Sequence, residues 1–300
     1  MKTNAPQFLS KSVQRWFNRG EVRSINGHEI FVIDEGRDKE STIVLIHGFP
    51  TSSYDFDRVW ETLSENHRLV CIDMLGFGFS DKPNKRDYTL HKQADLFDSL
   101  IRELGIEEYH VFAHDYGVSV AQELLARQID DSANGKWLSC CFLNGGLFPE
   151  THKALLIQKV MLSSAGRLVN KFAGFRQFGA SFSKVFGEKT KPSNDELREF
   201  WEIINYKDGR HLFHNLMTYI LDRREHRGRW VSALQNSPSP ISIINGSVDP
   251  VSGKHLVKRY RELNCRLDHL VELPTIGHYP HVEAPNEVCG AYLDFLRELP

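Results

Sequence analysis

Three residues that could supply a nucleophile, an acid and a base follow one another in the order Asp115, Asp249 and His278. Each comes just after a short apolar run with the length and composition of a buried strand. In an open sheet of parallel strands, side chains just beyond the carboxyl ends meet at one edge. The sequence therefore predicts a catalytic triad in which Asp115 is the nucleophile and Asp249 orients His278, the general base.

Asp115 lies at a sharp break between a predicted strand and a predicted helix. The residues 111–113 are apolar, and apolar residues recur at helical intervals from Val118 to Leu125. Ala113 and Gly117 lie two positions away on each side, and such small residues leave room for a tight turn. This pattern predicts a nucleophile elbow with a carboxylate in place of the usual Ser. The alternative interpretation is an Asp that only caps the helix.

A second loop could stabilise negative charge beside the nucleophile. His47, Gly48, Phe49 and Pro50 follow a predicted apolar strand. We expect the backbone N–H of Phe49, together with that of Tyr116, to form an oxyanion hole, while Gly48 allows the chain to approach closely. His47 and Pro50 complete this supporting loop.

An Asp nucleophile restricts the possible substrates. Attack by a carboxylate on an ester would give an anhydride, whereas attack on an sp3 carbon gives an alkyl ester that water can hydrolyse. We therefore expect a reaction that opens a C–O or C–halogen bond. Asp115 would displace the leaving group, and His278 would then activate the water that attacks the ester.

Strands and helices alternate along most of the chain. Asn26-Gly27 predicts the turn of an antiparallel hairpin over 21–35. Further strands are predicted at 42–46, 68–72, up to 113, 137–143, 241–244 and 267–273, with helices between them. This order predicts an α/β fold with a mostly parallel eight-stranded sheet and helices on both faces.

The alternation stops between 149 and 231, where helical patterns dominate and predict helices at Ala154–Leu162, Asn194–Tyr206 and His211–Asp222. We predict a helical cap over 149–231, inserted into a core made of 1–148 and 232–300. Its phenylalanines recur at spacings of three and four and favour a cap core, with a ligand surface as the alternative; they are Phe172, Phe175, Phe178, Phe182 and Phe186. The segment 149–231 has 15 Lys/Arg against 9 Asp/Glu. We interpret its most basic part, 223–229, as a solvated helix face with a C-terminal cap.

Composition indicates a globular protein and excludes several classes. The 300 residues, 41% of them hydrophobic, suit one large α/β domain or a core with an inserted subdomain. No apolar run approaches the roughly 20 residues of a membrane span. Residues 1–20 lack the apolar core of a signal peptide but could form a short amphipathic helix that packs on the body. We expect a cytoplasmic protein.

Neither charge nor cysteine content suggests a charged partner or a metal. A net charge of −2 gives no argument for binding nucleic acid. The five cysteines are odd in number and have no C-x-x-C spacing, which favours buried reduced thiols over disulfides or a metal site. We expect no metal and no cofactor, and the sequence leaves the oligomeric state open.

Four motifs resemble the epoxide hydrolase and haloalkane dehalogenase branch of the α/β-hydrolase fold: His-Gly-Phe-Pro at 47–50, His-Asp-Tyr-Gly at 114–117, Asp249-Pro250 and Gly-His-Tyr-Pro at 277–280. The resemblance covers nearly the whole chain from about Ile25. Two longer blocks, 114–127 and 144–152, resemble a hydrolase-like subgroup of this branch. The resemblance implies an α/β-hydrolase fold and an alkyl-enzyme ester on Asp115.

The two reactions of this branch, dehalogenation and epoxide hydrolysis, differ in the side chains that bind or protonate the leaving group. Haloalkane dehalogenases that resemble this chain place a Trp after the nucleophile, and often an Asn in the His-Gly loop, as donors to halide. Tyr116 and Phe49 stand at these positions. Epoxide hydrolases use cap tyrosines to protonate the epoxide oxygen. Tyr219 and Tyr206 are the candidates, and Tyr219 is preferred because Tyr-x-x-x-Arg resembles the donor segment of the family.

The first hypothesis is therefore an epoxide hydrolase-like enzyme that acts on a small, mainly apolar organic substrate and water. A haloalkane dehalogenase, the alternative, would need Trp201 or Trp230 to reach the halide from the cap. Fluoroacetate-type dehalogenation is disfavoured because the residue after Asp115 is not the Arg expected to bind a substrate carboxylate. A third hypothesis is a non-catalytic protein that binds a small ligand in the cap pocket, which an intact triad argues against.

Overall fold

The computed structural model describes residues 6–84, 88–151 and 174–299. Eight strands form one sheet in the order β1-β2-β4-β3-β5-β6-β7-β8. Their bounds are β1 Glu21–Ile25, β2 His28–Glu35, β3 Ser41–Ile46, β4 His67–Ile72, β5 Glu108–Ala113, β6 Lys136–Phe142, β7 Ile241–Gly246 and β8 His269–Leu273. Strand β2 is antiparallel to β1 and β4, and every other pairing is parallel. The predicted hairpin and mostly parallel sheet are confirmed.

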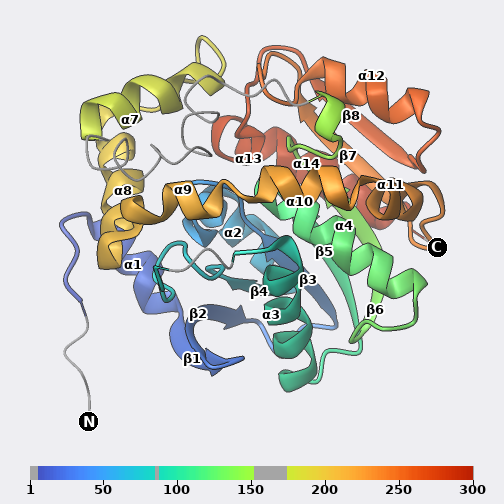
Figure 1. The fold of residues 1–300 in the computed structure, drawn as a ribbon, viewed down its shortest axis with the longest axis horizontal. Coiled ribbons are helices and arrows are strands. Elements are labelled where there is room, and N and C mark those ends of the chain that lie inside the picture. Colours follow the sequence, from blue (N-terminus) through green and yellow to red (C-terminus); the bar gives the residue numbers. More distant parts are fainter. Residues whose placement is uncertain (1–5, 85–87, 152–173, 300) are drawn as a thin grey trace.

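Helices cover both faces of this sheet (Figure 1). One face carries α3 (Leu90–Glu103), α4 (Tyr116–Ile129) and α12 (Lys254–Glu262). The other carries α1 (Lys11–Arg19), α2 (Asp57–Ser64) and α14 (Pro285–Arg297). Successive side chains of a strand point to opposite faces, so Val44 packs with the first set while Ile43 and Leu45 pack with the second. Three short helices lie in loops: η1 Ser53–Phe56, η2 Pro149–Thr151 and α13 Pro280–Glu283.

The amphipathic helix expected near the N-terminus is α1. Ser10 caps it by accepting hydrogen bonds from the amides of Ser12 and Val13. Its buried face carries Val13 and Trp16. The Trp16 ring packs edge-on against that of Trp60, with 4.9 Å between the ring centroids. Burial of this face fixes α1 to the body of the protein, as predicted.

The described residues 174–235 contain helices and no strand. The elements are α7 Phe175–Phe182, η3 Ser183–Val185, α8 Asn194–Asn205, η4 Tyr206–Leu212, α9 Phe213–Leu216, α10 Tyr219–Glu225 and α11 Arg227–Gln235. Figure 1 shows α8 to α11 running across the molecule above the sheet. The helix predicted at Ala154–Leu162, and Phe172, lie outside the described residues. The predicted limit between cap and core at 231 falls inside α11, which packs on α4. The division into core and cap stays a prediction.

The continuous helix predicted over 211–222 is wrong. The chain forms the end of η4, then α9, and a new helix that begins at Tyr219. The hydroxyl of Thr218 donates a hydrogen bond to the carbonyl of Asn215 at 2.8 Å. Such side-chain bonds compete with the backbone bonds of a helix, and they accompany the break between α9 and α10.

The phenylalanine stripe lies between the helical segment and the sheet. Phe178, Phe182 and Phe186 are buried. The rings of Phe182 and Phe186 lie 5.0 and 5.1 Å from the ring of Tyr279, in the loop after β8. The stripe therefore contributes apolar contacts that hold the helical segment on the rest of the protein.

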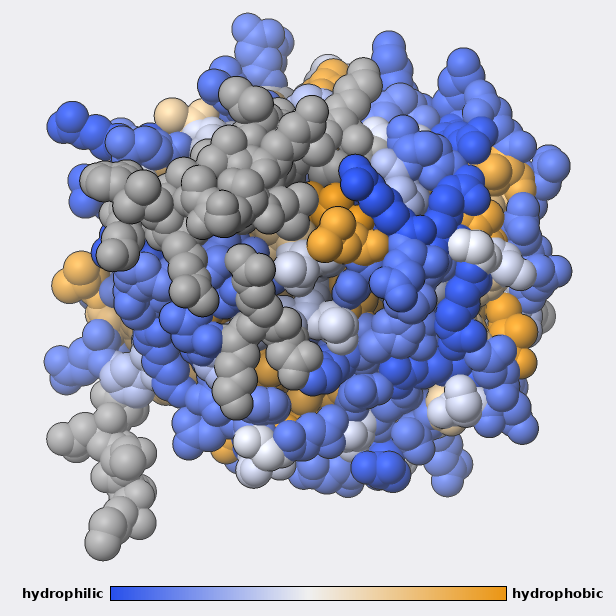
Figure 2. All heavy atoms as spheres, viewed as in Figure 1, coloured by the Kyte–Doolittle hydropathy of each residue, from blue (hydrophilic) through white to orange (hydrophobic). Residues whose placement is uncertain are grey.

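The surface and the cysteines agree with the composition. Within the residues that the structure describes, no helix combines the length and apolar character needed to cross a membrane. Among the coloured atoms of Figure 2, hydrophilic residues predominate and hydrophobic residues form only small patches. All five cysteines are buried and free, as predicted.

Candidate active site

Asp115 occupies the turn between β5 and α4 in a strained backbone conformation. Its φ is 44° and its ψ is −108°, values that a non-Gly residue rarely adopts. Gly117 is needed behind it, because a Cβ there would lie 2.3 Å from the carbonyl oxygen of Ile46. The Asp115 side chain makes no capping hydrogen bond to α4. The helix-cap interpretation therefore does not describe this residue.

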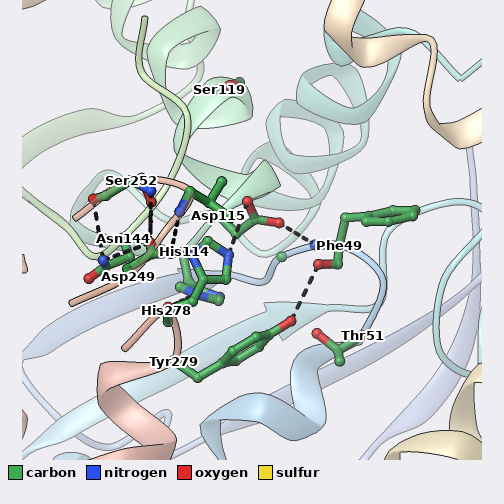
Figure 3. Close-up of polar contacts among 12 residues, drawn as sticks. Phe49, Thr51, His114, Asp115, Ser119, Asn144, Asp249, Ser252, His278 and Tyr279 are labelled. Carbon is green, nitrogen blue, oxygen red and sulfur yellow. Dashed lines mark hydrogen bonds and ion pairs between the residues drawn. The ribbon is translucent and has the colours of Figure 1, made fainter. Parts of the chain in front are cut away.

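The carboxylate of Asp115 instead lies between a backbone amide and an imidazole (Figure 3). The amide of Phe49 donates to Oδ2 of Asp115 at 2.9 Å. The Nε2 atom of His278 lies 3.5 Å from Oδ1. Both carboxylate oxygens are thus oriented, and the side chain is only 6% exposed.

His278 is held from its other side by Asp249. The Nδ1 atom of His278 donates to Oδ2 of Asp249 at 2.7 Å. The same carboxylate accepts hydrogen bonds from the hydroxyl of Ser252 at 2.7 Å and from the side-chain amide of Asn144 at 2.9 Å. These bonds fix the imidazole with Nε2 directed at Asp115. The structure thus brings together the three residues of the predicted triad.

Charge pairing sets the protonation of this group. Burial alone would raise the pKa of Asp115 and of Asp249, but in each case the nearby His278 lowers it below the ordinary value. Burial alone would lower the pKa of His278, but Asp249 and Asp115 raise it to about 10. At neutral pH the group is therefore an imidazolium between two carboxylates. Loss of either negative charge lowers the pKa of His278.

The loop at 47–50 is fitted closely to the elbow. The amide of Met74 donates to Nε2 of His47 at 3.0 Å, so Nδ1 carries the proton and donates to the carbonyl of Gly48 at 2.8 Å. A Cβ at Gly48 would lie 2.7 Å from the Cβ of Asp115. Gly at this position therefore allows the Phe49 amide to reach the carboxylate. Pro50 follows through a cis peptide bond.

The other predicted oxyanion-hole donor is the amide of Tyr116. Tyr116 is the first residue of α4, where an amide has no partner within the helix. Its ring is buried and lies 5.1 Å from the ring of Tyr219. The sequence thus placed Tyr116 correctly beside Asp115, and its part in an oxyanion hole stays a prediction.

The two predicted proton donors lie in different places. Tyr219 is buried, and its ring lies 6.2 Å from that of Phe49. Burial raises the pKa of Tyr219, to about 12, although the nearby Arg223 lowers it. Tyr206 instead packs on Phe8 and Phe79, at 5.7 and 5.5 Å. The structure does not bring Tyr206 to the triad.

Neither tryptophan considered for halide binding lies at the triad. The indole N–H of Trp230 donates to Glu123 at 2.9 Å, about two turns along α4 from the elbow. Trp201 is partly buried, and its ring packs on Phe175 and Phe178.

Sequence reasoning missed two contributors to the site. Asn144 is the second residue after β6, and this position beyond a strand end was a signal that could have identified it. Arg223 is 3% exposed, so the interpretation of 223–229 as a solvated helix face is wrong for this residue. It is buried because α10 packs against the elbow, where the Nε of Arg223 donates to the hydroxyl of Ser119 at 2.7 Å. Arg227 and Arg229, by contrast, form partly exposed ion pairs.

One buried group beside the elbow has the donor types of a metal site. Ligand atoms of Asp55, His114 and His281 lie within 4.8 Å of one another. Burial lowers the pKa of both imidazoles, so they are neutral near pH 7, and it raises the pKa of the Asp55 carboxyl. His114 also donates from Nε2 to the carbonyl of His278 at 2.8 Å. This contact supports the loop that carries His278, and the expectation of no metal or cofactor stays a prediction.

Comparisons with known proteins agree with this architecture. The model of the alpha/beta hydrolase fold family matches residues 41–285. The mesoderm-specific transcript protein of Mus musculus is 36% identical over 300 residues, which span 97% of this chain and 90% of that protein. The Homo sapiens homolog is 37% identical with the same coverage. A cis-3-alkyl-4-alkyloxetan-2-one decarboxylase of Shewanella oneidensis is 25% identical over 290 residues, 92% of this chain and 87% of that protein.

Solved structures show the same fold. The haloalkane dehalogenase DbeA from Bradyrhizobium elkani superposes with a TM-score of 0.76 at 18% identity, covering 93% of this chain and 98% of that chain. An alpha/beta hydrolase fold protein from Burkholderia ambifaria gives a TM-score of 0.73 at 22% identity, covering 91% and 97%. The predicted α/β-hydrolase fold is confirmed, and the mesoderm-specific transcript proteins are the subgroup that the two sequence blocks resemble. The chain therefore belongs to the alpha/beta hydrolase fold family and is related over nearly its whole length to the mesoderm-specific transcript proteins.

Proposed function

We propose that this chain is a hydrolase that opens an sp3 C–O bond of a strained cyclic ether, as an epoxide hydrolase does, with Asp115 as the nucleophile. One observation carries the proposal: the Asp115 carboxylate leaves its helix uncapped and lies between the Phe49 amide and His278. This is the arrangement that a carboxylate nucleophile requires, because one group must hold it and another must activate water against its ester.

In the first step, Asp115 attacks a ring carbon and the C–O bond breaks. The oxygen that leaves takes a proton, and Tyr219 is the proposed donor. Its high pKa keeps the phenol protonated until the alkoxide, a stronger base, forms. The products of this step are an alkyl ester on Asp115, an alcohol on the substrate and a tyrosinate.

In the second step, water attacks the carbonyl carbon of the Asp115 ester. Ester formation removes the negative charge of Asp115, so the pKa of His278 falls, and the proton of the imidazolium neutralises the tyrosinate left by the first step. The neutral His278 then takes a proton from the attacking water, and the amides of Phe49 and Tyr116 stabilise the oxyanion. Collapse of the tetrahedral intermediate releases the diol and the Asp115 carboxylate and leaves His278 protonated, as it was before the reaction.

The surroundings of the triad favour C–O cleavage over C–halogen cleavage. Halide release needs N–H donors at the leaving atom, yet the indole of Trp230 is bonded to Glu123 and Trp201 packs on other cap aromatics. Dehalogenation remains the alternative function, and binding without catalysis is the second alternative. The Shewanella oneidensis relative is named for a four-membered ring with an sp3 C–O bond, which supports testing β-lactones beside epoxides.

The test is the intact mass of His278→Gln after incubation with epoxides, β-lactones and haloalkanes. Loss of the base should trap the ester on Asp115, because the second step then becomes slow. An adduct with the whole mass of an epoxide or lactone would support the proposal, and one with only the alkyl group would establish dehalogenation. The variant Asp115→Asn, treated in the same way, controls for alkylation elsewhere. A folded His278→Gln protein that forms no adduct would favour the ligand-binding alternative.

A further inference from the structure

Arg223 is a buried cation without an ion-pair partner among the described residues. Its side chain lies in α10 with 3% exposure. Its hydrogen bonds go to uncharged acceptors, the hydroxyl of Ser119 at 2.7 Å and the backbone carbonyl of Asp115, which Nη2 reaches at 3.4 Å. An unpaired buried charge destabilises a protein strongly, so such charges normally have a partner.

The guanidinium lies within a closely fitted site at the elbow. Its central carbon lies 4.5 Å from the centroid of the Tyr219 ring. On another side it packs on Gly146, where a Cβ would lie 2.2 Å from Nη1. A guanidinium carries more N–H donors than these contacts use. Several donors of Arg223 thus remain available beside the nucleophile.

No carboxylate of the described residues forms an ion pair with Arg223, although the Asp115 carboxylate lies near enough for the charge of Arg223 to lower its pKa. The carboxylate of Asp115 is bonded to Phe49 and His278, so Arg223 contacts only its main chain. The segment 152–173, which lies outside the described residues, contains four basic residues and no acidic one. Asp87 is the one acidic side chain outside the described residues.

The position of Arg223 relative to α4 adds to this imbalance. Ser119 and the carbonyl of Asp115 both belong to the N-terminal turn of α4, a helix of 14 residues. The N-terminus of a helix carries partial positive charge and favours an anion over a cation. A ligand anion beside Arg223 would therefore be attracted by both charges.

We propose that Arg223 binds a carboxylate of the substrate, so that the natural substrate is a strained cyclic ether with a carboxylate near the reacting carbon. This proposal rests on the proposed function and replaces the expectation of a mainly apolar substrate. The residue after Asp115 is Tyr116, which offers no positive charge to a substrate carboxylate. In the folded protein an Arg reaches the same elbow from α10. A bidentate Arg–carboxylate contact would also orient the ring for attack.

The kinetic test compares two epoxides of matched size, trans-3-phenylglycidate and trans-3-phenylglycidol, which differ in a carboxylate and a CH2OH group. The wild type should prefer the glycidate in kcat/KM by about 10- to 100-fold, the range of a charge-assisted hydrogen bond. Arg223→Gln should lose this preference, and Arg223→Lys should keep part of it. Arg224→Gln, with the same change in charge at the exposed neighbouring residue, should keep all of it. Equal losses for both epoxides in Arg223→Gln would overturn the proposal and make Arg223 a structural contact.

A binding test is independent of the chemistry. Unreactive carboxylates from acetate to 3-phenylpropionate, each paired with its primary amide, are titrated by calorimetry and thermal shift. At least one carboxylate should bind more tightly than its amide to the wild type and to Arg224→Gln, and this difference should vanish in Arg223→Gln. Such binding without turnover of any epoxide would refute the proposed function and leave the carboxylate site in place. Turnover of an epoxide with no carboxylate preference in either test would refute the carboxylate site and leave the proposed function in place. If Arg223→Gln does not fold, Arg223→Lys replaces it in both tests. The proposal then holds if the wild type prefers the carboxylate and Arg223→Lys prefers it less, and it fails if the two proteins do not differ.

Discussion

An arginine lies at each end of helix α4, and the two differ in how their charge is paired: Arg127 in the last turn of α4 itself and the buried Arg223 of α10 at the first turn. At the C-terminal end, Arg127 donates to Asp98 at 2.6 Å and to Glu123 at 3.0 Å, and lies 2.8 Å from Asp95. At the N-terminal end, Arg223 donates hydrogen bonds to a hydroxyl and a carbonyl and has no ion-pair partner among the described residues. The charge is therefore paired at the partly exposed C-terminal end of the helix and unpaired at the buried N-terminal end, beside Asp115.

The helix dipole sharpens this contrast. A cation at the C-terminus of a helix is stabilised by the partial negative charge there, whereas a cation at the N-terminus is not. Arg127 therefore gains from the helix dipole, whereas Arg223 lies where the dipole favours an anion. The C-terminal end of α4 thus carries a paired charge that contributes to stability, and the N-terminal end carries a charge that the proposed substrate carboxylate would pair.

The largest effect that would separate the two ends is expected from Asp115→Asn. Turnover should fall at least about 10,000-fold, because the nucleophile is lost, as for other residues that act as a catalytic unit. The melting temperature should change little, since Asn is similar in shape and tolerates a positive φ. Steady-state kinetics and circular dichroism check both, and intact mass excludes reversion to Asp by deamidation. A variant that loses stability but keeps turnover would break the comparison.

Arg127→Gln should show the opposite behaviour. Removal of Arg127 leaves the buried carboxylate of Asp98 without its cation, so the free energy of unfolding should fall by about 3 kcal/mol. Chemical denaturation measures this change. The exposed Arg102 of α3 supplies the control, because Arg102→Gln makes the same change in charge with an expected effect within about 0.5 kcal/mol. Per folded molecule, turnover should stay close to that of the wild type, and a large loss would contradict the division between the ends.

Tyr219→Phe tests the proton donor at the N-terminal end. Formation of the ester with an epoxide should slow about 100-fold, the lower range for loss of a general acid. The rate of adduct formation is measured in the His278→Gln background, which isolates the first step. Tyr206→Phe is the matched control and should change this rate less than about twofold, because Tyr206 packs on Phe8 and Phe79. Equal slowing by both changes would exclude Tyr219 as the specific donor.

A smaller effect is the pH dependence of the free energy of unfolding. It should arise from His278, whose imidazolium can lose its proton, and not from Arg127, whose guanidinium cannot. The pKa of His278 is raised from 6.5 to about 10 in the folded protein. A raised pKa stabilises the protein fully below pH 6.5, and this stabilisation is lost as pH rises toward 10. The difference in stability between the wild type and His278→Gln should therefore shrink by about 1 kcal/mol for each pH unit from 6.5 to 8.

Denaturation midpoints across this pH range measure that difference. Taking it between two variants cancels groups that titrate in both, such as Lys82, whose pKa burial lowers to about 7. The same measurement on Arg127→Gln should give a difference that is constant with pH. A pH-independent difference for His278→Gln would mean that its imidazole is not charged in the folded protein.

The parts of the fold that the sequence predicted are those that local pattern determines. The buried strands, the Asn26-Gly27 hairpin and the elbow at Asp115 follow from short runs of residues, and the ends of parallel strands then meet by topology. The parts that it missed depend on contacts between distant elements. Nothing near Arg223 in the sequence indicates that α10 packs on the elbow, and the difference between Tyr219 and Tyr206 arises from the same packing.

The close contact between Gly146 and Arg223 constrains how this sequence can change over time. A lineage that acquires any side chain at position 146 while keeping Arg223 would displace the guanidinium, since even a Cβ would overlap Nη1. A lineage that first loses Arg223 is free to fill position 146, and an Arg that returned afterwards would have to place its guanidinium elsewhere. We therefore expect substitutions at these two residues, 77 positions apart, to be correlated.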